Sequence, residues 1–328
     1  MFAVIVVSVV FGIALAMDGM KRSVQGEGPA IVETFGADQW IVAGGATGPF
    51  TTTRVIDADV AEEVADARRA DPVVLSRSAI DGDTPRDVNL IGYVPGGLGG
   101  PTISEGRAVR APGEVVVSTG TSEEVGDRIR IGGETFRVVG TTDGGRYYFG
   151  VPSAFMTLDD AQSIVFKGAP LATAIAVRGR AEPPPGTRVY TNDEVVDDLD
   201  RPLEAGYSSI IVMAFLMWII AAGIIGLIVY LSAIERTRDF AVFKATGAPN
   251  RVIVGGLMIQ AVLVALIAAV VGVPLSRIVT QGMPTKSGLV WTSVVQLVVV
   301  AVVVGVLASL AAVRRALTTD PAVAFGGK

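Results

Sequence analysis

Long apolar runs alternate with polar sequence along this 328-residue chain. The apolar runs are Met1–Met17, Tyr207–Leu231, Val252–Leu275 and Leu289–Val313. A helix crosses the hydrocarbon core of a bilayer with about 20 apolar residues, and about 17 is the lower limit. The pattern therefore predicts four transmembrane α-helices, one for each run.

The first apolar run has two interpretations. Ala14-Leu15-Ala16 is similar to the cleavage site of a signal peptide, which would make Met1–Met17 a removable segment. A signal peptide usually begins with positive charge, and no Lys or Arg precedes this run. The sequence favours a transmembrane helix.

The only large polar segment, Asp18–Gly206, is predicted to form an α+β domain. Gly132-Gly133 between two expected strands predicts a hairpin, and the sheet is expected to be mixed or antiparallel. Expected strands are Gln39–Ala43, Val73–Ser78, Val88–Val94, Glu114–Ser118, Arg128–Ile131, Thr135–Gly140 and Ala172–Val177. Expected helices are Asp59–Arg69, Ser122–Val125 and Thr157–Phe166, the last with Thr157 as N-cap.

An acidic stalk, Asn192–Glu204, follows this domain and leads into the second apolar run. It is interpreted as a helix that continues into the membrane, with Pro202 as a kink or a restart. A solvated linker is the alternative.

A charged segment of 20 residues, Ser232–Arg251, separates the second and third apolar runs, and we call it the island. Its first half is charged and helix-forming, its middle carries Phe240 and Phe243, and Gly247–Asn250 predicts a turn. Such a loop offers a soluble partner a place to bind.

Lys and Arg in the short loops predict the orientation of the chain. The island has four, the tail Arg314–Lys328 has three, and the loop Ser276–Gly288 has two. Because cytoplasmic loops are enriched in Lys and Arg, the island and tail are placed in the cytoplasm. The large domain is then extracytoplasmic, in a multi-pass protein of the plasma membrane.

Composition excludes several classes of protein. The chain has no Cys and no His, which removes thiol chemistry, disulfides, Ser-His-Asp triads and the usual zinc sites. No basic footprint for nucleic acid exists outside the short loops. We expect no catalytic site, metal or cofactor in this chain.

Some positions within the apolar runs are expected to face other helices rather than lipid. Small residues four apart allow helices to approach closely, and amide side chains are costly in lipid. The expected helix-packing residues are Ser8, Gly12, Gln260, Gln296, Ala301, Gly305 and Ser309.

Several motifs resemble the FtsX-like/MacB-like ABC transporter permeases, and most closely the DevC-type, actinobacterial ones. Glu235–Ala248, ERTRDFAVFKATGA, is similar to the family loop ERxREFAVLKAxGA. Ile259–Ala261 matches the family step that follows, and Arg314–Phe325 matches the closing pattern RRAxxxDPAxAL/F. Gly113–Ser118 and Val125–Thr141 resemble the MacB-like core-domain pattern.

The resemblance implies that two copies of this chain pair with two separate ABC ATPase subunits, which bind ATP and Mg. Motion driven by ATP would pass through the second span and the stalk to the outer domain. Membrane lipid would be a further partner. The implied ATPase-coupling residues are Glu235, Arg236, Arg238, Asp239, Phe240, Phe243, Lys244 and Gly247. Simple anchoring of these charges at the membrane surface is the alternative.

Three functions stay open at this point. The first is a permease that exports or extracts a hydrophobic, lipid-like or peptide substrate. The second is a non-transporting FtsX-like transducer that regulates an extracytoplasmic cell-wall hydrolase, directly or through an adaptor. The third is a membrane-anchored sensor or adhesion module without an ATPase.

Overall fold

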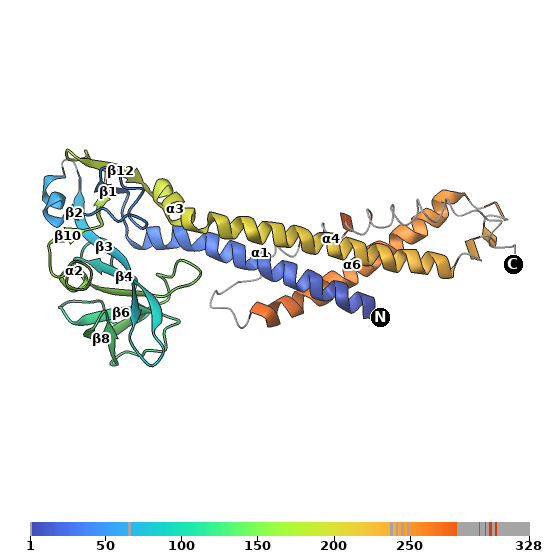
Figure 1. Ribbon diagram of the computed structural model, residues 1–328, viewed down its shortest axis with the longest axis horizontal. Helices are drawn as coiled ribbons and strands as arrows, with labels where there is room; N and C mark the ends of the chain where they lie inside the picture. Colours follow the sequence, from blue (N-terminus) through green and yellow to red (C-terminus); the bar gives the residue numbers. More distant parts are fainter. Residues whose placement is uncertain are drawn as a thin grey trace. The chain divides into compact units, whose positions relative to one another are not determined.

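The computed structural model describes residues 2–64, 67–236, 239–240, 242–243, 246–247 and 249–280, with single valines at 295, 299, 302, 303 and 306. The chain divides into two compact units. The helical unit comprises Met1–Ser23 and Gly206–Lys328, and the sheet domain comprises Val24–Ala205 (Figure 1).

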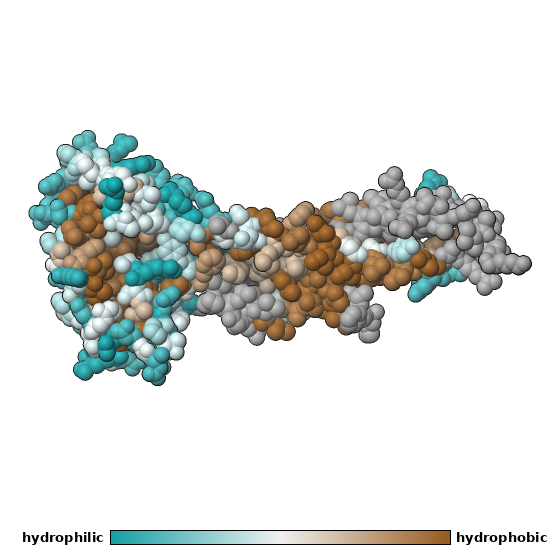
Figure 2. Space-filling view, viewed as in Figure 1, coloured by the Kyte–Doolittle hydropathy of each residue, from teal (hydrophilic) through white to brown (hydrophobic). Residues whose placement is uncertain are grey.

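Long helices form the described part of the helical unit. They are α1 (Phe2–Thr34), α4 (Glu204–Glu235) and α6 (Asn250–Thr280). By length and composition, Gly206–Glu235 and Val254–Ile278 are candidate membrane spans, and their surface is strongly apolar (Figure 2). The expected spans Tyr207–Leu231 and Val252–Leu275 coincide with these helices, whereas Leu289–Val313 lies outside the described residues except for the single valines.

The first helix is longer than the sequence predicts. The expected boundary at Asp18 falls inside α1, which continues to Thr34 and enters the sheet domain. Arg22 Nε donates to Asp18 Oδ2 at 2.9 Å, an i,i+4 ion pair that supports helix across the polar transition. A loss of hydrophobicity marks where an apolar run ends, and it does not mark where a helix ends.

Strands of the sheet domain close into a ring. β3 pairs with β4, β4 with β9, β9 with β6, β6 with β8, β8 with β7, and β7 returns to β3 through Ile131 and Ile80. The bounds are β3 Arg69–Ile80, β4 Arg86–Tyr93, β6 Glu114–Ser118, β7 Arg128–Ile131, β8 Glu134–Thr142 and β9 Ser153–Thr157. Parallel pairs (β4 with β9, β6 with β8) make the sheet mixed, as predicted.

Alternate residues of these strands fill the ring. Val88 and Leu90 of β4 belong to one buried cluster, while Ile91 and Tyr93 belong to another. Period-two alternation explains this division, because successive side chains of a strand point to opposite faces. α2 (Leu158–Phe166) contributes the buried Ala161 to the first cluster.

β3 also belongs to a second group of strands, in the order β12, β1, β11 and β3. These are β1 Gln39–Ala43, β11 Ala174–Arg178 and β12 Thr187–Thr191. Two-residue strands complete the domain: β2 Ile56–Asp57 pairs with β10 Leu171–Ala172, and β5 Glu105–Gly106 pairs with β8.

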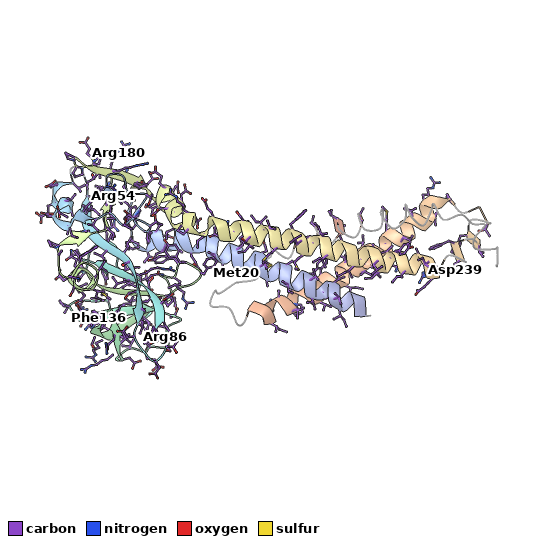
Figure 3. All side chains as sticks on the ribbon, viewed as in Figure 1. Met20, Arg54, Arg86, Phe136, Arg180 and Asp239 are labelled. Atoms are coloured by element: carbon purple, nitrogen blue, oxygen red, sulfur yellow. The ribbon has the colours of Figure 1, made fainter. Side chains whose placement is uncertain are left out.

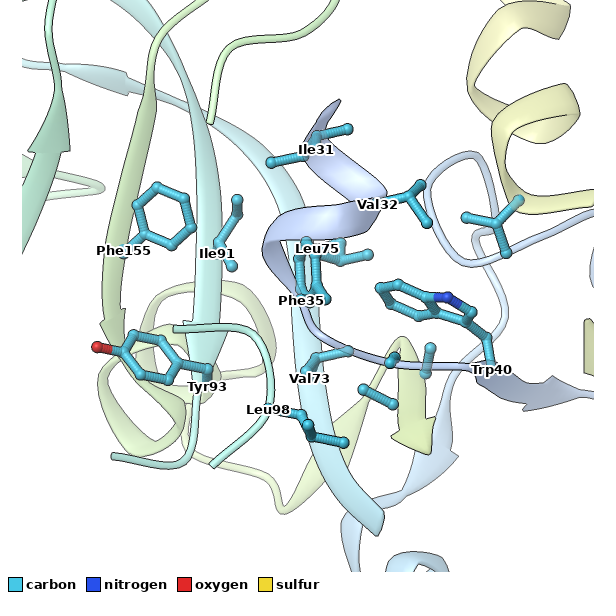
Figure 4. Packing of buried hydrophobic residues seen from close by; sticks show 14 of the residues in the cluster. Ile31, Val32, Phe35, Trp40, Val73, Leu75, Ile91, Tyr93, Leu98 and Phe155 are labelled. Atoms are coloured by element: carbon cyan, nitrogen blue, oxygen red, sulfur yellow. The ribbon is translucent and has the colours of Figure 1, made fainter. Parts of the chain in front are cut away.

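The last turns of α1 and Phe35, the residue directly after it, lie in the main core of the sheet domain. Ile31 and Phe35 are buried beside Trp40 and Ile91, and the Phe35 and Trp40 ring centroids are 4.9 Å apart (Figure 4). Side chains of α3 (Asn192–Asp200) complete the same cluster. Both chain segments that connect this domain to the helical unit therefore end in one hydrophobic core.

Two predicted helices are wrong. The segment predicted as Asp59–Arg69 forms only a 3₁₀ helix, η1 (Ala58–Glu63), because Arg68 N–H donates to Arg178 O and β3 begins at Arg69. Ser122–Val125 is not helical: a turn follows at Val125-Gly126, and the Asp127 carboxylate accepts the Glu124 N–H at 2.9 Å.

Candidate functional site

The island continues helically beyond α4. Arg236 N–H donates to Ser232 O at 3.2 Å and Phe240 N–H donates to Arg236 O at 3.0 Å. Gly247 then has a φ of 87°, in the left-handed region. Glycine tolerates this conformation without steric cost, and it commonly follows the end of a helix. Thr246 and Gly247 form a turn; of the expected turn Gly247–Asn250, Ala248 lies outside the described residues and Asn250 begins α6.

Side chains of the island differ in exposure. Glu235, Arg236 and Asp239 are exposed, and Asp239 is labelled in Figure 3. Phe243 is 54% exposed, whereas Phe240 is half-buried against the apolar cluster of the helical unit. The predicted coupling residues Arg238 and Lys244 lie outside the described residues.

The island also carries two neighbouring exposed apolar side chains, so it is not only a charged loop. Val242 is 61% exposed and lies beside Phe243 in the sequence. Apolar anchors on a helical segment, bordered by charges, suit insertion into a groove of another protein. The arrangement can form a contact surface. Phe240 packs against the buried cluster of the helical unit and so connects the island to that unit.

Close packing joins α1 and α6 within the helical unit. A Cβ built on Gly12 would lie 3.1 Å from Gly272 O, and one built on Gly272 would lie 3.2 Å from Ser8 O. Ser8 is buried. The small residues singled out in the sequence therefore lie where two helix backbones approach each other.

A polar pair joins α4 and α6. Ser232 Oγ donates to Gln260 Oε1 at 3.2 Å. This is the interhelical hydrogen bond that the sequence favours for Gln260. The other expected packing residues, Gln296, Ala301, Gly305 and Ser309, lie outside the described residues.

The stalk is anchored in the sheet domain. Asn192 Oδ1 accepts Trp40 Nε1–H at 2.9 Å, and Asn192 Nδ2 donates to Ala37 O at 2.9 Å. Thr191 and Glu194 form a capping box at the start of α3. The expected single helix is interrupted: Pro202, expected as a kink or a restart, lies inside the 3₁₀ turn η2 (Arg201–Leu203) that separates α3 from α4. The stalk is a helix and not a solvated linker.

Asp198 holds the neighbouring loop, a role that the sequence analysis missed. This residue is fully buried, and its carboxylate accepts the N–H groups of Phe50 and Thr51 at 3.0 and 3.2 Å, and also the Thr51 hydroxyl. It lies in an acidic stretch of sequence, a pattern that is typical of a solvent-exposed helix face. Only the buried Val195 and Leu199 on either side of it hint at an inward position.

Titratable groups of the sheet domain are shifted for different reasons. Hydrogen bonding from Arg107 lowers the pKa of Glu114 to about 2. Burial raises the pKa of Glu27, although backbone N–H groups of Gly150 and Phe149 oppose that shift. Burial also raises the pKa of Tyr148 to about 12.

Comparisons with known proteins match two stretches of the chain, and the first of them also includes the part of α1 that lies in the helical unit. A family model described as MacB-like periplasmic core domain matches residues 3–184, and one described as FtsX-like permease C-terminal matches residues 211–321. An uncharacterized ABC transporter permease of Mycobacterium bovis is 38% identical over 330 residues, covering 99% of this chain and 95% of that protein. The chain belongs to the ABC transporter permease family.

Another curated relative and one solved structure are also similar to this permease, to different extents. One from Mycobacterium tuberculosis, also named an uncharacterized ABC transporter permease, is 36% identical over 334 residues, covering 99% of this chain and 94% of that protein. The extracellular domain of the noncanonic ABC-type transporter YknZ from Gram-positive bacteria matches 44% of this chain and 83% of that one. Its TM-score is 0.34 and its sequence identity 11%.

Proposed function

We propose that this permease couples ATP hydrolysis by a separate ABC ATPase subunit to motion of its sheet domain. The observation that carries the proposal is the exposed Phe243 with Val242, in the island that follows α4 and between residues that are charged in the sequence. A partner groove would bury these two side chains and pair with Glu235, Arg236 and Asp239. Burying a Phe or Val side chain contributes roughly 1.5–3 kcal/mol.

Continuity of the helical elements supports transmission of that motion. α4 begins at Glu204, immediately after η2, and η2 follows α3 without a loop. Asp198 and Asn192 fix α3 to the sheet domain. A displacement of α4 would therefore act on α3, which is hydrogen-bonded to the core of the sheet domain, and not on a flexible linker.

The remaining parts of the proposal are the assembly and topology that the sequence predicts. Two permease chains would pair with two ATPases in the plasma membrane, each chain with four spans and the sheet domain outside. The ATPases would hold ATP and Mg, and this chain would not be an enzyme. Export or extraction of a hydrophobic, lipid-like or peptide substrate is the favoured activity.

A non-transporting transducer is the second candidate. The firm anchoring of α3 favours it, because a rigid connection suits the switching of an extracytoplasmic hydrolase by mechanical force. The two candidates share the ATPase contact and differ in what the sheet domain acts upon.

The test is capture of the ATPase encoded next to this permease by the detergent-solubilised chain. We compare the wild type with Phe243→Ser and, from the sequence motif, Arg238→Glu. Val125→Ser is the matched control, since Val125 is an exposed apolar residue of the sheet domain. We expect wild type and control to capture the ATPase and stimulate its hydrolysis, and the island variants to do neither.

Two results would contradict the proposal. The first is equal capture and stimulation by all variants, which would place the ATPase contact elsewhere. The second is no capture by any form, which would favour the membrane-anchored sensor or adhesion module. Membrane fractionation of each variant shows that a loss of capture is not a loss of insertion.

A further inference from the structure

An aromatic cleft opens in the sheet domain. Its volume is about 530 Å³, within the range of small-molecule sites. Its walls include Phe50, Tyr147, Tyr148 and Phe149, with Leu75 beside them. Phe50 and Tyr147 meet edge to face with ring centroids 5.4 Å apart, so the wall is packed and preformed.

Two of these aromatic residues, Tyr148 and Phe149, have a strained backbone conformation. Tyr148 and Phe149 have φ values of 56° and 64°, in the left-handed region. Bulky residues rarely adopt this conformation, and consecutive ones are rarer still. Strain of this kind persists where surrounding structure enforces it, and it is concentrated at binding sites. Gly150, also at positive φ, completes the turn.

The positively charged side chain of Arg77 lines the cleft. Arg77 of β3 is exposed, and its guanidinium carbon lies 5.0 Å from the centroid of the Tyr148 ring. Within the described part of the chain, no Asp or Glu pairs with the Arg77 side chain, and none lines the cleft. Arg77 therefore keeps its hydrogen-bond donors for a ligand.

The other polar groups at the cleft are already bonded within the chain. Thr51, Thr52 and Ser76 line the cleft, but their hydroxyls donate to Asp198, to Arg54 O and to Arg77 O, so Arg77 is the donor left for a ligand. The nearby carboxylate of Asp198 is already bonded to Phe50 N–H and Thr51 N–H, so its oxygens face the loop. A positive group beside aromatic walls selects a ligand with one acidic end and one apolar end.

We infer that this cleft binds a small anionic amphiphile, with a phosphate or carboxylate on Arg77 and its apolar part against Phe50, Tyr148 and Phe149. Arginine binds both anions through paired N–H donors. Pro202 and Leu203 of η2 also line the cleft, so the ligand would contact the segment that directly precedes α4. The inference goes beyond the proposed function, and it does not depend on the ATPase.

The test measures binding of hexyl phosphate to the full chain in lipid nanodiscs by equilibrium dialysis, with empty nanodiscs as the blank. Hexanoate and inorganic phosphate are run beside it, because they separate a carboxylate from a phosphate and an amphiphile from a free anion. Arg77→Gln removes the charge and keeps a long polar side chain. Arg180→Gln is the matched control, since Arg180 is an exposed arginine of the same domain and does not line the cleft (Figure 3).

We expect saturable binding of hexyl phosphate or hexanoate at one site per chain, weakened about tenfold or more by Arg77→Gln and unchanged by Arg180→Gln. A second variant, Phe149→Ser, should also weaken it while leaving inorganic phosphate unaffected. Binding equal to empty nanodiscs, or equal in Arg77→Gln and wild type, would overturn the inference. A chain that binds hexyl phosphate and fails to capture the ATPase would keep this inference and overturn the proposed function.

Discussion

The buried carboxylate of Asp198 accepts the backbone N–H of Phe50 at 3.0 Å, across 148 residues of sequence. Gly48 lies against the same carboxylate so closely that a Cβ there would overlap with it. The stalk helix thus holds the loop that forms one wall of the cleft.

Asp198→Ala should destabilise the sheet domain by about 2–4 kcal/mol, because the half-buried N–H groups of Phe50 and Thr51 lose the buried carboxylate that accepts them. The apparent Tm of the solubilised chain, followed by intrinsic fluorescence, measures this loss. Asp197→Ala, one position away and exposed, should leave Tm unchanged. Equal effects of the two substitutions would show that the loop does not need the carboxylate.

Gly272→Val should weaken packing between α1 and α6 by about 1–3 kcal/mol, since its side chain would meet Ser8 O and Gly12 N at 3.2 Å. The same Tm measurement in detergent detects it. Gly223→Val is the control, because a Cβ on Gly223 meets nothing within 4 Å among the described residues. If Gly223→Val lowers Tm as much, helix propensity and not packing is responsible.

The ionised Glu114 should make the stability of the sheet domain depend on pH in the acidic range. Its pKa in the folded chain is about 2, against an ordinary value of 4.5, because Arg107 donates hydrogen bonds to it. A lowered carboxyl pKa adds stability above the ordinary value, and that stability is lost as pH falls from about 4.5 toward 2. The Tm of wild type should therefore fall more steeply over this interval than the Tm of Glu114→Gln. Parallel curves would contradict the prediction.

Gly92 of β4 and Ala161 of α2 form a close contact, and a Cβ on Gly92 would overlap with the Ala161 Cβ. Gly92→Ala should destabilise the domain by about 1–3 kcal/mol through overpacking. Ala161→Gly in the same chain frees the space and should restore part of the loss, beyond the sum of the single substitutions. Strictly additive effects would mean that the two residues do not compete for one space.

Local signals in the sequence predicted much of the sheet domain. β1, β6 and β7 begin and end where alternation and turn residues place them, and Gly132 and Gly133 have the positive φ values of a two-residue hairpin turn. Thr157 caps α2 through the Asp160 N–H, as its position before the helix predicts. These features depend on residues close together in the chain.

Features that depend on distant contacts were missed. β9 is buried at every position, so it shows no alternation that could mark it as a strand. η1 stops short because β3 pairs with β11, about 100 residues later, and no local signal reports that pairing. The same applies to Arg77 and Tyr148, which meet across 71 residues of sequence.

The order of the strands has a consequence for biosynthesis. Every strand of the ring lies between Arg69 and Thr157, so the ring can close while later residues are still being made. β1 is different, because it pairs with β11 and β12, which end at Thr191. The backbone groups of β1 and the Trp40 side chain find their partners only after more than a hundred further residues have been synthesised. Until then, a nascent chain carries an unpaired hydrophobic strand, and this is the interval in which a chaperone or protease would recognise it.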